Sequence, residues 1–269
     1  MLNEFINLPW PRIILLFAFF YLLFLAFAWF YAEKILFPFP QPATYSKKEV
    51  DFFISIPNKI EIACIQEKAQ KANGLVVLYS HGNGEDLGMV REQLKKLTRF
   101  GCDFISYDYP GYGLSGGNPT EEGCYEAIKC LYDHLIAEMG VAPRNIILWG
   151  RSLGTGPSCF LASKNEVAGL LLETPFLSAF RTITEIPVLP WDRFRNIKFV
   201  SSIECPSLVI HGNMDEVVPF RQGRKIHRAL PHPNELLEIK GASHNNIAEV
   251  GARLYDESIY KFLKNLVND

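Results

Sequence analysis

Short apolar runs alternate with amphipathic segments along most of this chain, and no other feature constrains its fold as strongly. The runs predict eight strands, at 52–56, 60–66, 75–80, 104–107, 145–149, 169–172, 207–211 and 236–239. Apolar residues at helical spacing predict helices over 86–99, 120–139, 221–230 and 247–266. Strands that alternate with helices build βαβ units, which place the strands parallel in one sheet and the helices on its faces. We therefore expect an α/β fold with a mainly parallel sheet flanked by helices.

The composition supports a folded domain and excludes several classes of protein. Of the 269 residues, 48 % are hydrophobic and 21 % are charged, which suffices for a large core and excludes intrinsic disorder. The net charge is −2 and no basic stripe is visible, so we expect no nucleic-acid partner. The six cysteines form no C-x-x-C pair and no cluster with zinc spacing. Nothing suggests a metal or an organic cofactor, and we expect neither.

An uncharged segment near the start, residues 13–32, reads IILLFAFFYLLFLAFAWFYA. A helix of this length rises about 1.5 Å per residue and just crosses a hydrocarbon core of roughly 30 Å. The segment therefore predicts a single-pass membrane anchor after a short tail, 1–12. The alternatives are a cleaved signal peptide, with Ala26-Phe27-Ala28 as its cleavage site, and a buried helix of a soluble protein. The apolar run continues past that site and has no polar side, which favours the retained anchor.

Residues 33–50 contain Pro38, Pro40 and Pro42 and predict a semi-rigid linker between the anchor and a folded domain at 51–269. The anchor places the protein at a membrane. Lys34, Lys47 and Lys48 follow it and a single arginine precedes it, which slightly favours the cytoplasmic side for the domain without deciding it.

The strand run at 145–149 ends in the sequence GRSLG at 150–154, which has the form G-x-S-x-G. A sharp turn between a strand and a helix forces its central serine into a crowded backbone conformation and needs small residues on both sides. The hydroxyl of Ser152 would then project from the end of the sheet as a nucleophile. The alternative is a glycine-rich turn with an incidental serine.

A serine hydroxyl needs a base, and histidine suits that task because its pKa lies near neutrality. Among six histidines, His244 lies in a loop after the last predicted strand and before the last helix, where the chain order Ser…Asp…His places the base. Asp215 follows the strand at 207–211 and is the expected third member, which holds the imidazole tautomer. Glu173 follows the strand at 169–172 and is the competing acid.

Acyl transfer also needs donors for the developing oxyanion. We expect the backbone N–H of Leu153, directly after the nucleophile, and that of Asn83 in the glycine-rich loop at 80–84. The alternative for this loop is an ordinary strand-to-helix turn.

Over residues 50–267 the chain resembles the α/β-hydrolase superfamily, in the motifs SHGNGEDLG, SYDYPGYGLSGG, WGRSLG, VIHGNMDEVVP and GASHNN. Within it, the chain is similar to membrane-associated α/β-hydrolase-domain proteins, a depalmitoylase-like and serine aminopeptidase-like group. The resemblance implies the Ser-His-Asp triad, and structural roles for Asp108 and residues 111–113. The sequence departs from the depalmitoylases in two respects. Residues 1–63 contain no cysteine for lipidation, and Arg151 stands where those enzymes commonly have glutamine.

The segment at 174–204 is too long for a plain turn and predicts a small cap over the site. Its apolar residues are expected to line an acyl pocket, or alternatively to pack against the sheet edge: Phe176, Leu177, Leu189 and Trp191. The leading hypothesis is a membrane-anchored serine hydrolase that cleaves carboxylic esters or thioesters of apolar acyl groups, on a lipid or an acylated protein. One alternative is an aminopeptidase-like amide hydrolase, although the cap acids Glu173, Glu185 and Asp192 are scattered. The other is a non-catalytic membrane scaffold.

Overall fold

The computed structural model of the chain describes residues 10–38, 42–184, 188–231 and 233–268. The chain divides into two compact units, residues 1–38 and 39–269, and each is described by itself. Parts of the expected tail, linker and cap therefore lie outside the described residues. Glu185 also lies outside them.

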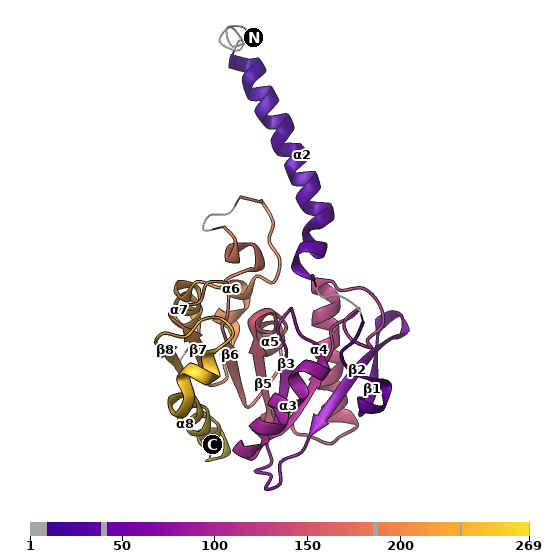
Figure 1. The fold of residues 1–269 in the computed structure, drawn as a ribbon, viewed down its shortest axis with the longest axis vertical. Coiled ribbons are helices and arrows are strands. Elements are labelled where there is room, and N and C mark those ends of the chain that lie inside the picture. Colours follow the sequence, from indigo (N-terminus) through magenta and orange to yellow (C-terminus); the bar gives the residue numbers. More distant parts are fainter. Residues whose placement is uncertain (1–9, 39–41, 185–187, 232, 269) are drawn as a thin grey trace. The chain divides into compact units, whose positions relative to one another are not determined.

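The first unit contains one long apolar helix, α2 (Trp10–Leu36), of 27 residues (Figure 1). It extends beyond the expected anchor at both ends, because a helix continues for as long as its backbone hydrogen bonds do, and polar residues such as Glu33 and Lys34 fit within it. Its mean hydropathy reaches 2.7, so by length and composition it could cross a membrane, a test that signal sequences also pass.

The second unit is built on one sheet of eight strands, which confirms the expected fold class. They are β1 (Phe52–Ile56), β2 (Ile60–Glu67), β3 (Val76–Ser80), β4 (Asp103–Tyr107), β5 (Ile146–Arg151), β6 (Gly169–Glu173), β7 (Ser207–Gly212) and β8 (Asn234–Ile239). Their order is β1-β2-β4-β3-β5-β6-β7-β8. The pairs β1–β2 and β2–β4 are antiparallel, and the other five pairs are parallel. The parallel strands therefore present their carboxyl ends at one edge, where the predicted site residues lie.

Helices cover both faces of this sheet. They are α3 (Leu87–Leu97), α4 (Glu121–Ala137), α5 (Thr155–Ala162), α6 (Asn196–Phe199), α7 (Phe220–Ala229) and α8 (Ile247–Asn268), the last interrupted at Ala252. Helices α3 and α8 share one core with residues of the central strands. Helices α5 and α7 pack on the sheet through β5, β6, β7 and β8, and α4 packs on α5 and β1.

Short 3₁₀ helices complete the described elements: η1 (Lys47–Glu49), η2 (Pro57–Lys59), η3 (Thr98–Phe100), η4 (Pro143–Asn145), η5 (Ser152–Gly154), η6 (Ala179–Thr182) and η7 (Val200–Ser202). The connection between β6 and β7, which contains η6, α6 and η7, is the expected cap. At the middle of the sheet the rings of Tyr79 and Trp149 are fully buried and meet edge to face at 6.0 Å. Aromatic pairs in this arrangement add to the stability that burial provides.

Residues 44–50, called the strap here, fall within the semi-rigid linker expected at 33–50 and pack on the second unit. The backbone N–H of Thr44 donates to the Asp86 carboxylate at 2.7 Å, and the hydroxyl of Tyr45 donates to Asp108. Tyr45 is only 8 % exposed, and Ser46 with Glu49 forms a capping box on η1. The prolines at 38–42 indicate a linker, but they give no sign of the contacts of the strap, because its partners Asp86 and Asp108 lie about 40 to 60 residues further along the chain.

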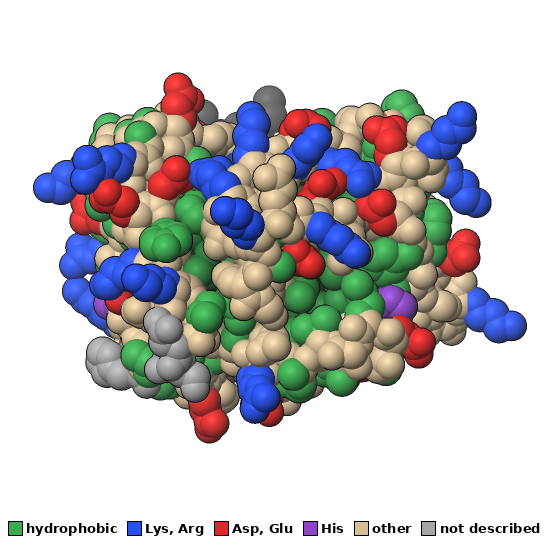
Figure 2. Space-filling view, turned by 90° about the horizontal axis from the view of Figure 1, so that it is seen from below, with side chains coloured by type: hydrophobic (Ala, Val, Ile, Leu, Met, Phe, Trp, Pro, Cys, Tyr) green, Lys and Arg blue, Asp and Glu red, His purple; other side chains and the backbone are tan. Residues whose placement is uncertain are grey.

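The surface carries charges of both signs. On the face drawn in Figure 2, Lys and Arg side chains are interspersed with Asp and Glu around a band of hydrophobic side chains. This mixture accords with the chain's net charge of −2.

Candidate active site

Ser152 lies on a strained turn directly after β5. Its φ is +50°, in the left-handed region that side chains other than glycine rarely adopt. A Cβ at Gly150 would lie 2.4 Å from the carbonyl oxygen of Gly154, and a Cβ at Gly154 would lie 2.0 Å from that of Ser80. The turn can therefore close against the end of β3 only with glycine at both positions. This is the physical reason for the G-x-S-x-G sequence.

The structure brings the three predicted triad residues into one hydrogen-bonded chain. The Nε2 atom of His244 lies 3.0 Å from the Oγ atom of Ser152. The Nδ1 atom of His244 lies 2.8 Å from the Oδ2 atom of Asp215. The three residues come from the loops after β5, β7 and β8, at the carboxyl edge of the sheet. This is the geometry in which an imidazole can deprotonate a serine while a carboxylate orients it.

The carboxylate of Asp215 is held by four groups. Its Oδ1 atom accepts the N–H groups of Val217 at 2.9 Å and Val218 at 2.7 Å. Its Oδ2 atom lies 2.8 Å from His244 and 3.2 Å from the Nε2 atom of His211. Burial alone would raise the pKa of Asp215, but hydrogen bonds from His211, His244 and Val218 hold that pKa well below its usual range. Asp215 is therefore ionised wherever the fold is intact near neutral pH.

His211 precedes a glycine at the end of a strand, and the sequence alone does not single it out. In the structure its Nε2–H donates to the carbonyl of Val218 at 2.8 Å and also faces Asp215. The signal that could have identified this contact is the spacing of four residues between His211, near the end of β7, and Asp215, in the loop that follows.

Glu173, the competing acid, has different partners. Its carboxylate accepts the hydroxyl of Tyr255 at 2.8 Å and lies 3.5 Å from the Nε atom of Arg151. Burial raises the pKa of Glu173, and Arg151 and Tyr255 offset only part of that effect. In the structure His244 therefore pairs with Asp215, whereas Glu173 contacts Arg151 and Tyr255.

The expected oxyanion donors lie on two loops that touch. Because Gly154 packs against the carbonyls of Ser80 and His81, the turn that carries Leu153 lies directly against the loop that carries Asn83. The backbone N–H of Gly82 donates to the Oε2 atom of Glu85 at 2.7 Å, which shapes that loop. Leu153 also lies at the start of η5 and α5, where helix N–H groups favour negative charge.

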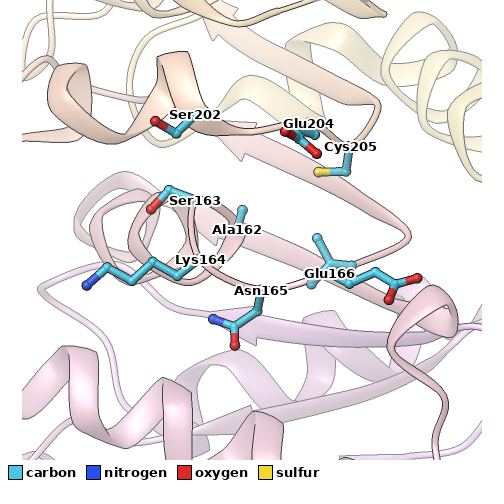
Figure 3. A pocket seen from close by; sticks show the side chains of 9 residues that line it. Ala162, Ser163, Lys164, Asn165, Glu166, Ser202, Glu204 and Cys205 are labelled. Carbon is cyan, nitrogen blue, oxygen red and sulfur yellow. The ribbon is translucent and has the colours of Figure 1, made fainter.

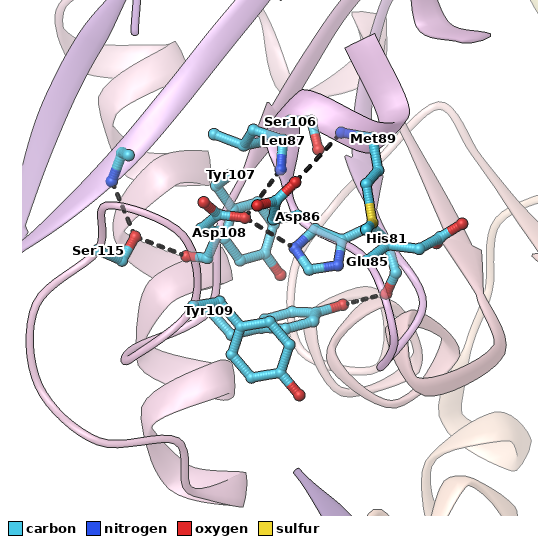
Figure 4. A network of polar contacts seen from close by, with 12 residues as sticks. His81, Glu85, Asp86, Leu87, Met89, Ser106, Tyr107, Asp108, Tyr109 and Ser115 are labelled. Atoms are coloured by element: carbon cyan, nitrogen blue, oxygen red, sulfur yellow. Dashed lines mark hydrogen bonds and ion pairs between the residues drawn. The ribbon is translucent and has the colours of Figure 1, made fainter. Parts of the chain in front are cut away.

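Asp108 lies next to His81, in the loop at 80–84 that carries Asn83 (Figure 4). This fully buried carboxylate accepts the N–H of Leu87 at 3.1 Å and the hydroxyl of Tyr45, and it lies 3.3 Å from the Nε2 atom of His81. Burial lowers the pKa of His81, but Asp108, the carbonyl of Gly82 and the charge of Glu85 together leave that pKa raised. A Cβ at Gly113 would lie 1.9 Å from Asp108. These contacts fit the structural roles that the resemblance implies for Asp108 and residues 111–113.

The four expected pocket residues lie in the cap at different depths. Phe176 is 3 % exposed, and its carbonyl accepts the amide of Asn196 at 3.1 Å, while the backbone N–H of Leu177 donates to Gln222 at 3.0 Å. Leu177, Leu189 and Trp191 are half-buried. Their role as walls of an acyl pocket stays a prediction.

One cavity, of about 460 Å³, lies at the opposite edge of the sheet, between the end of α5 and the segment before β7 (Figure 3). Its lining residues include Asn165, Glu166 and Cys205, and no member of the triad. Within the described residues, His, Cys, Asp and Glu form no group of three or more that could hold a metal ion.

A mainly parallel sheet flanked by helices, with a serine on a strained turn at the carboxyl end of a central strand, is the arrangement of the α/β-hydrolase fold. A family model described as alpha/beta hydrolase fold matches residues 76–185. The chain belongs to the alpha/beta hydrolase domain-containing proteins. It is 36 % identical to protein 17C of Mus musculus over 228 residues, 82 % of this chain and 71 % of that protein. It is 35 % identical to protein 17B of Homo sapiens, over 83 % of this chain and 80 % of that protein.

The nematode relative aho-3 of Caenorhabditis elegans is 36 % identical over 76 % of this chain, and the match spans 65 % of that protein. Solved structures share the fold at lower identity. The esterase Pf2001 of Pyrococcus furiosus has a TM-score of 0.70 at 17 % identity, covering 85 % of this chain and 99 % of that one. Est1E of Butyrivibrio proteoclasticus, solved with ferulic acid, has a TM-score of 0.67 at 17 % identity, covering 81 % of this chain and 100 % of that one.

Proposed function

We propose that the protein is a membrane-anchored serine hydrolase that cleaves carboxylic esters or thioesters of apolar acyl groups. The observation that carries this proposal is the chain of hydrogen bonds from Asp215 through His244 to Ser152, with separations of 2.8 and 3.0 Å. The strained turn presents the serine hydroxyl at the sheet edge, as a nucleophile requires.

In this mechanism the Nε2 atom of His244 takes the proton of Ser152 while the serine oxygen attacks the substrate carbonyl. Asp215 holds the ring and stabilises the imidazolium. The N–H groups of Asn83 and Leu153 donate to the oxyanion of the tetrahedral intermediate. His244 then protonates the leaving alcohol or thiol, and an acyl group remains on Ser152. His244 activates a water that releases this acyl group and restores the free serine.

The substrate class rests on chemistry and location. Apolar cap residues, including Leu177 and Trp191, favour longer acyl chains, because each buried methylene contributes about 0.8 kcal/mol. Pf2001, one of the solved proteins named above, carries the name of an esterase. A thioester presents the same kind of acyl carbonyl to a serine nucleophile, so the proposed class includes thioesters. Seven residues, 37–43, separate the end of α2 from the strap. At no more than about 3.6 Å per residue, a membrane-anchored α2 would keep the site within reach of acylated lipids or proteins.

The test is a comparison of kcat/KM for p-nitrophenyl acetate, butyrate, hexanoate and octanoate, with an aminoacyl-naphthylamide as the amide substrate. We expect kcat/KM to rise from acetate toward octanoate and the amide to be a poor substrate. The Ser152→Ala protein prepared in the same way is the matched control. A preference for acetate together with brisk aminopeptidase turnover would replace the proposal with an amide hydrolase. Absence of turnover on every substrate would favour a scaffold.

A further inference from the structure

The side chain of Arg151 contacts three side chains from other segments of the chain. Its guanidinium forms an ion pair with Glu85, donates through Nη2 to the side-chain oxygen of Asn245 at 2.9 Å, and approaches Glu173 through Nε at 3.5 Å. The side chain is only 12 % exposed. Burying a guanidinium is costly unless its donors are matched, and here three side chains match them.

The three partners come from different parts of the proposed catalytic machinery. Glu85 directly follows the loop at 80–84 that carries Asn83, called the oxyanion loop here, and its other oxygen accepts the N–H of Gly82 at 2.7 Å. Asn245 directly follows His244. Arg151 itself directly precedes Ser152. One side chain on the nucleophile turn therefore connects to the loop of the oxyanion donor and to the loop of the base.

Glu173 forms an ion pair with the Nε atom of the guanidinium from the neighbouring strand. It is paired with Arg151 in the register of β5 and β6, and Tyr255 of α8 donates to it at 2.8 Å. The planar guanidinium presents its donors in fixed directions, so an arginine held at one end defines where its other partners lie. A lysine at this position would keep the charge but would lose this directional set of donors.

We propose that Arg151 is a positioning residue: it holds the oxyanion loop and the loop of His244 at the correct positions relative to Ser152. This inference rests on the proposed function. It predicts an effect larger in the transition state than in substrate binding, because oxyanion donors and base must be placed to within about 0.5 Å. Misplacement by about 1 Å can lower the rate by roughly 10²-fold.

A neighbouring cavity makes the test specific. A cavity of about 380 Å³ is lined by Arg151 and its three partners, together with residues of α3 and α8. Replacing Arg151 with alanine would leave an empty space next to this cavity. The former partners of the guanidinium, Glu85, Glu173 and Asn245, would surround that space. Free guanidinium ion can occupy such a vacancy and supply the same planar donors.

We expect Arg151→Ala in the full-length protein to lower kcat for p-nitrophenyl octanoate about 10- to 100-fold while KM changes less than about threefold. Guanidinium chloride at a few millimolar should restore kcat at least several-fold, whereas the same concentration of sodium chloride should not. Arg151→Lys should recover less activity than guanidinium does. Affinity for an octyl trifluoromethyl ketone, which mimics the tetrahedral intermediate, should fall in parallel with kcat/KM.

Arg99→Ala is the matched control. Arg99 lines the same cavity, but its guanidinium pairs with Asp256 at 2.6 Å and donates to the carbonyl of Lys96 at 2.9 Å, and neither partner belongs to the proposed catalytic machinery. We expect its kcat to be unchanged with and without guanidinium. If Arg151→Ala proves unfolded by circular dichroism, Glu85→Gln is the second variant, and its kcat should fall with KM retained.

The inference is overturned if folded Arg151→Ala keeps the wild-type kcat and only its melting temperature falls, since that is the signature of a purely structural ion pair. It is also overturned if the lowered kcat shows no response to guanidinium. The proposed function fails separately, by absence of Ser152-dependent turnover in the wild-type protein.

Discussion

Two buried carboxylates, Asp215 and Glu173, lie at the carboxyl edge of the sheet in opposite environments. Asp215 receives two backbone N–H groups and faces two histidines, which hold its pKa low. Glu173 has Tyr255 and Arg151 as partners, and burial keeps its pKa raised. Environments that separate the pKa values of neighbouring acids are how such sites assign different tasks to the same side-chain type.

The two acids therefore predict opposite sensitivities. Asp215→Asn should lower kcat by about 10⁴-fold, because the amide favours the wrong imidazole tautomer. Glu173→Gln should cost far less, since a glutamine can still accept from Tyr255. The measurement is kcat for p-nitrophenyl octanoate in both variants, with circular dichroism to show that each is folded. Reversed effects would assign the acid to Glu173.

At this scale the sequence predicts local chemistry and misses contacts made across loops. The order of Ser152, Asp215 and His244 and their places after strands suffice to predict that the three residues come together. The connections of Arg151 are not predictable in this way, because Glu85 and Asn245 lie 66 and 94 residues from it. The contact between His211 and Asp215 was missed because a histidine before a glycine also fits an ordinary turn.

Among the elements, the strap shows how a segment with no regular pattern can be part of a core. Tyr45 buries its ring beside α3 and donates to Asp108, the carboxylate that also contacts His81 behind the oxyanion loop. Thr44 meets Asp86, the N-cap residue of α3. The strap therefore stabilises the start of α3 and the back of the oxyanion loop together.

A truncated chain that begins at residue 42 should be folded and active, whereas one that begins at Phe52, near the start of the folded domain predicted at 51–269, should be less stable. Loss of the buried Tyr45 ring should lower the free energy of unfolding by roughly 3–5 kcal/mol, as for other buried aromatic residues. Urea denaturation of the two chains measures the difference. Equal stability of both would show that the strap is dispensable.

Tyr45→Phe in the longer chain separates the ring from the hydroxyl. It should cost about 1–3 kcal/mol, because Asp108 loses a buried donor while the ring stays packed. An unchanged free energy of unfolding would mean that the hydroxyl does not contribute.

The strands and helices themselves were predicted well because their apolar patterns are local. The predicted helix at 120–139 is α4, and its apolar stripe is buried, including Cys124, Ile128, Leu131 and Leu135. The ends of α2 were predicted less well, because the apolar segment that defines a membrane span is shorter than the helix that contains it.

For the whole molecule, the proposal assigns membrane attachment to the apolar helix and hydrolysis to the second unit. The helix α2 has the length and hydropathy of a membrane span, and the second unit holds every residue of the proposed mechanism. Full-length protein should therefore remain with membranes after washing at alkaline pH in carbonate. The chain that begins at residue 42 should be released under the same treatment. Recovery of a mature chain that begins at Trp29 would identify the segment as a cleaved signal.

The most direct test of the account is the identity of the residue that becomes acylated. The protein is mixed briefly with p-nitrophenyl octanoate, or with a fluorophosphonate probe, and digested for peptide mapping by mass spectrometry. We predict one adduct per chain, on Ser152, and no adduct in Ser152→Ala, whose kcat should fall on the order of 10⁴- to 10⁶-fold with the fold intact. An adduct that persists in Ser152→Ala, or that maps to another residue, would contradict the account.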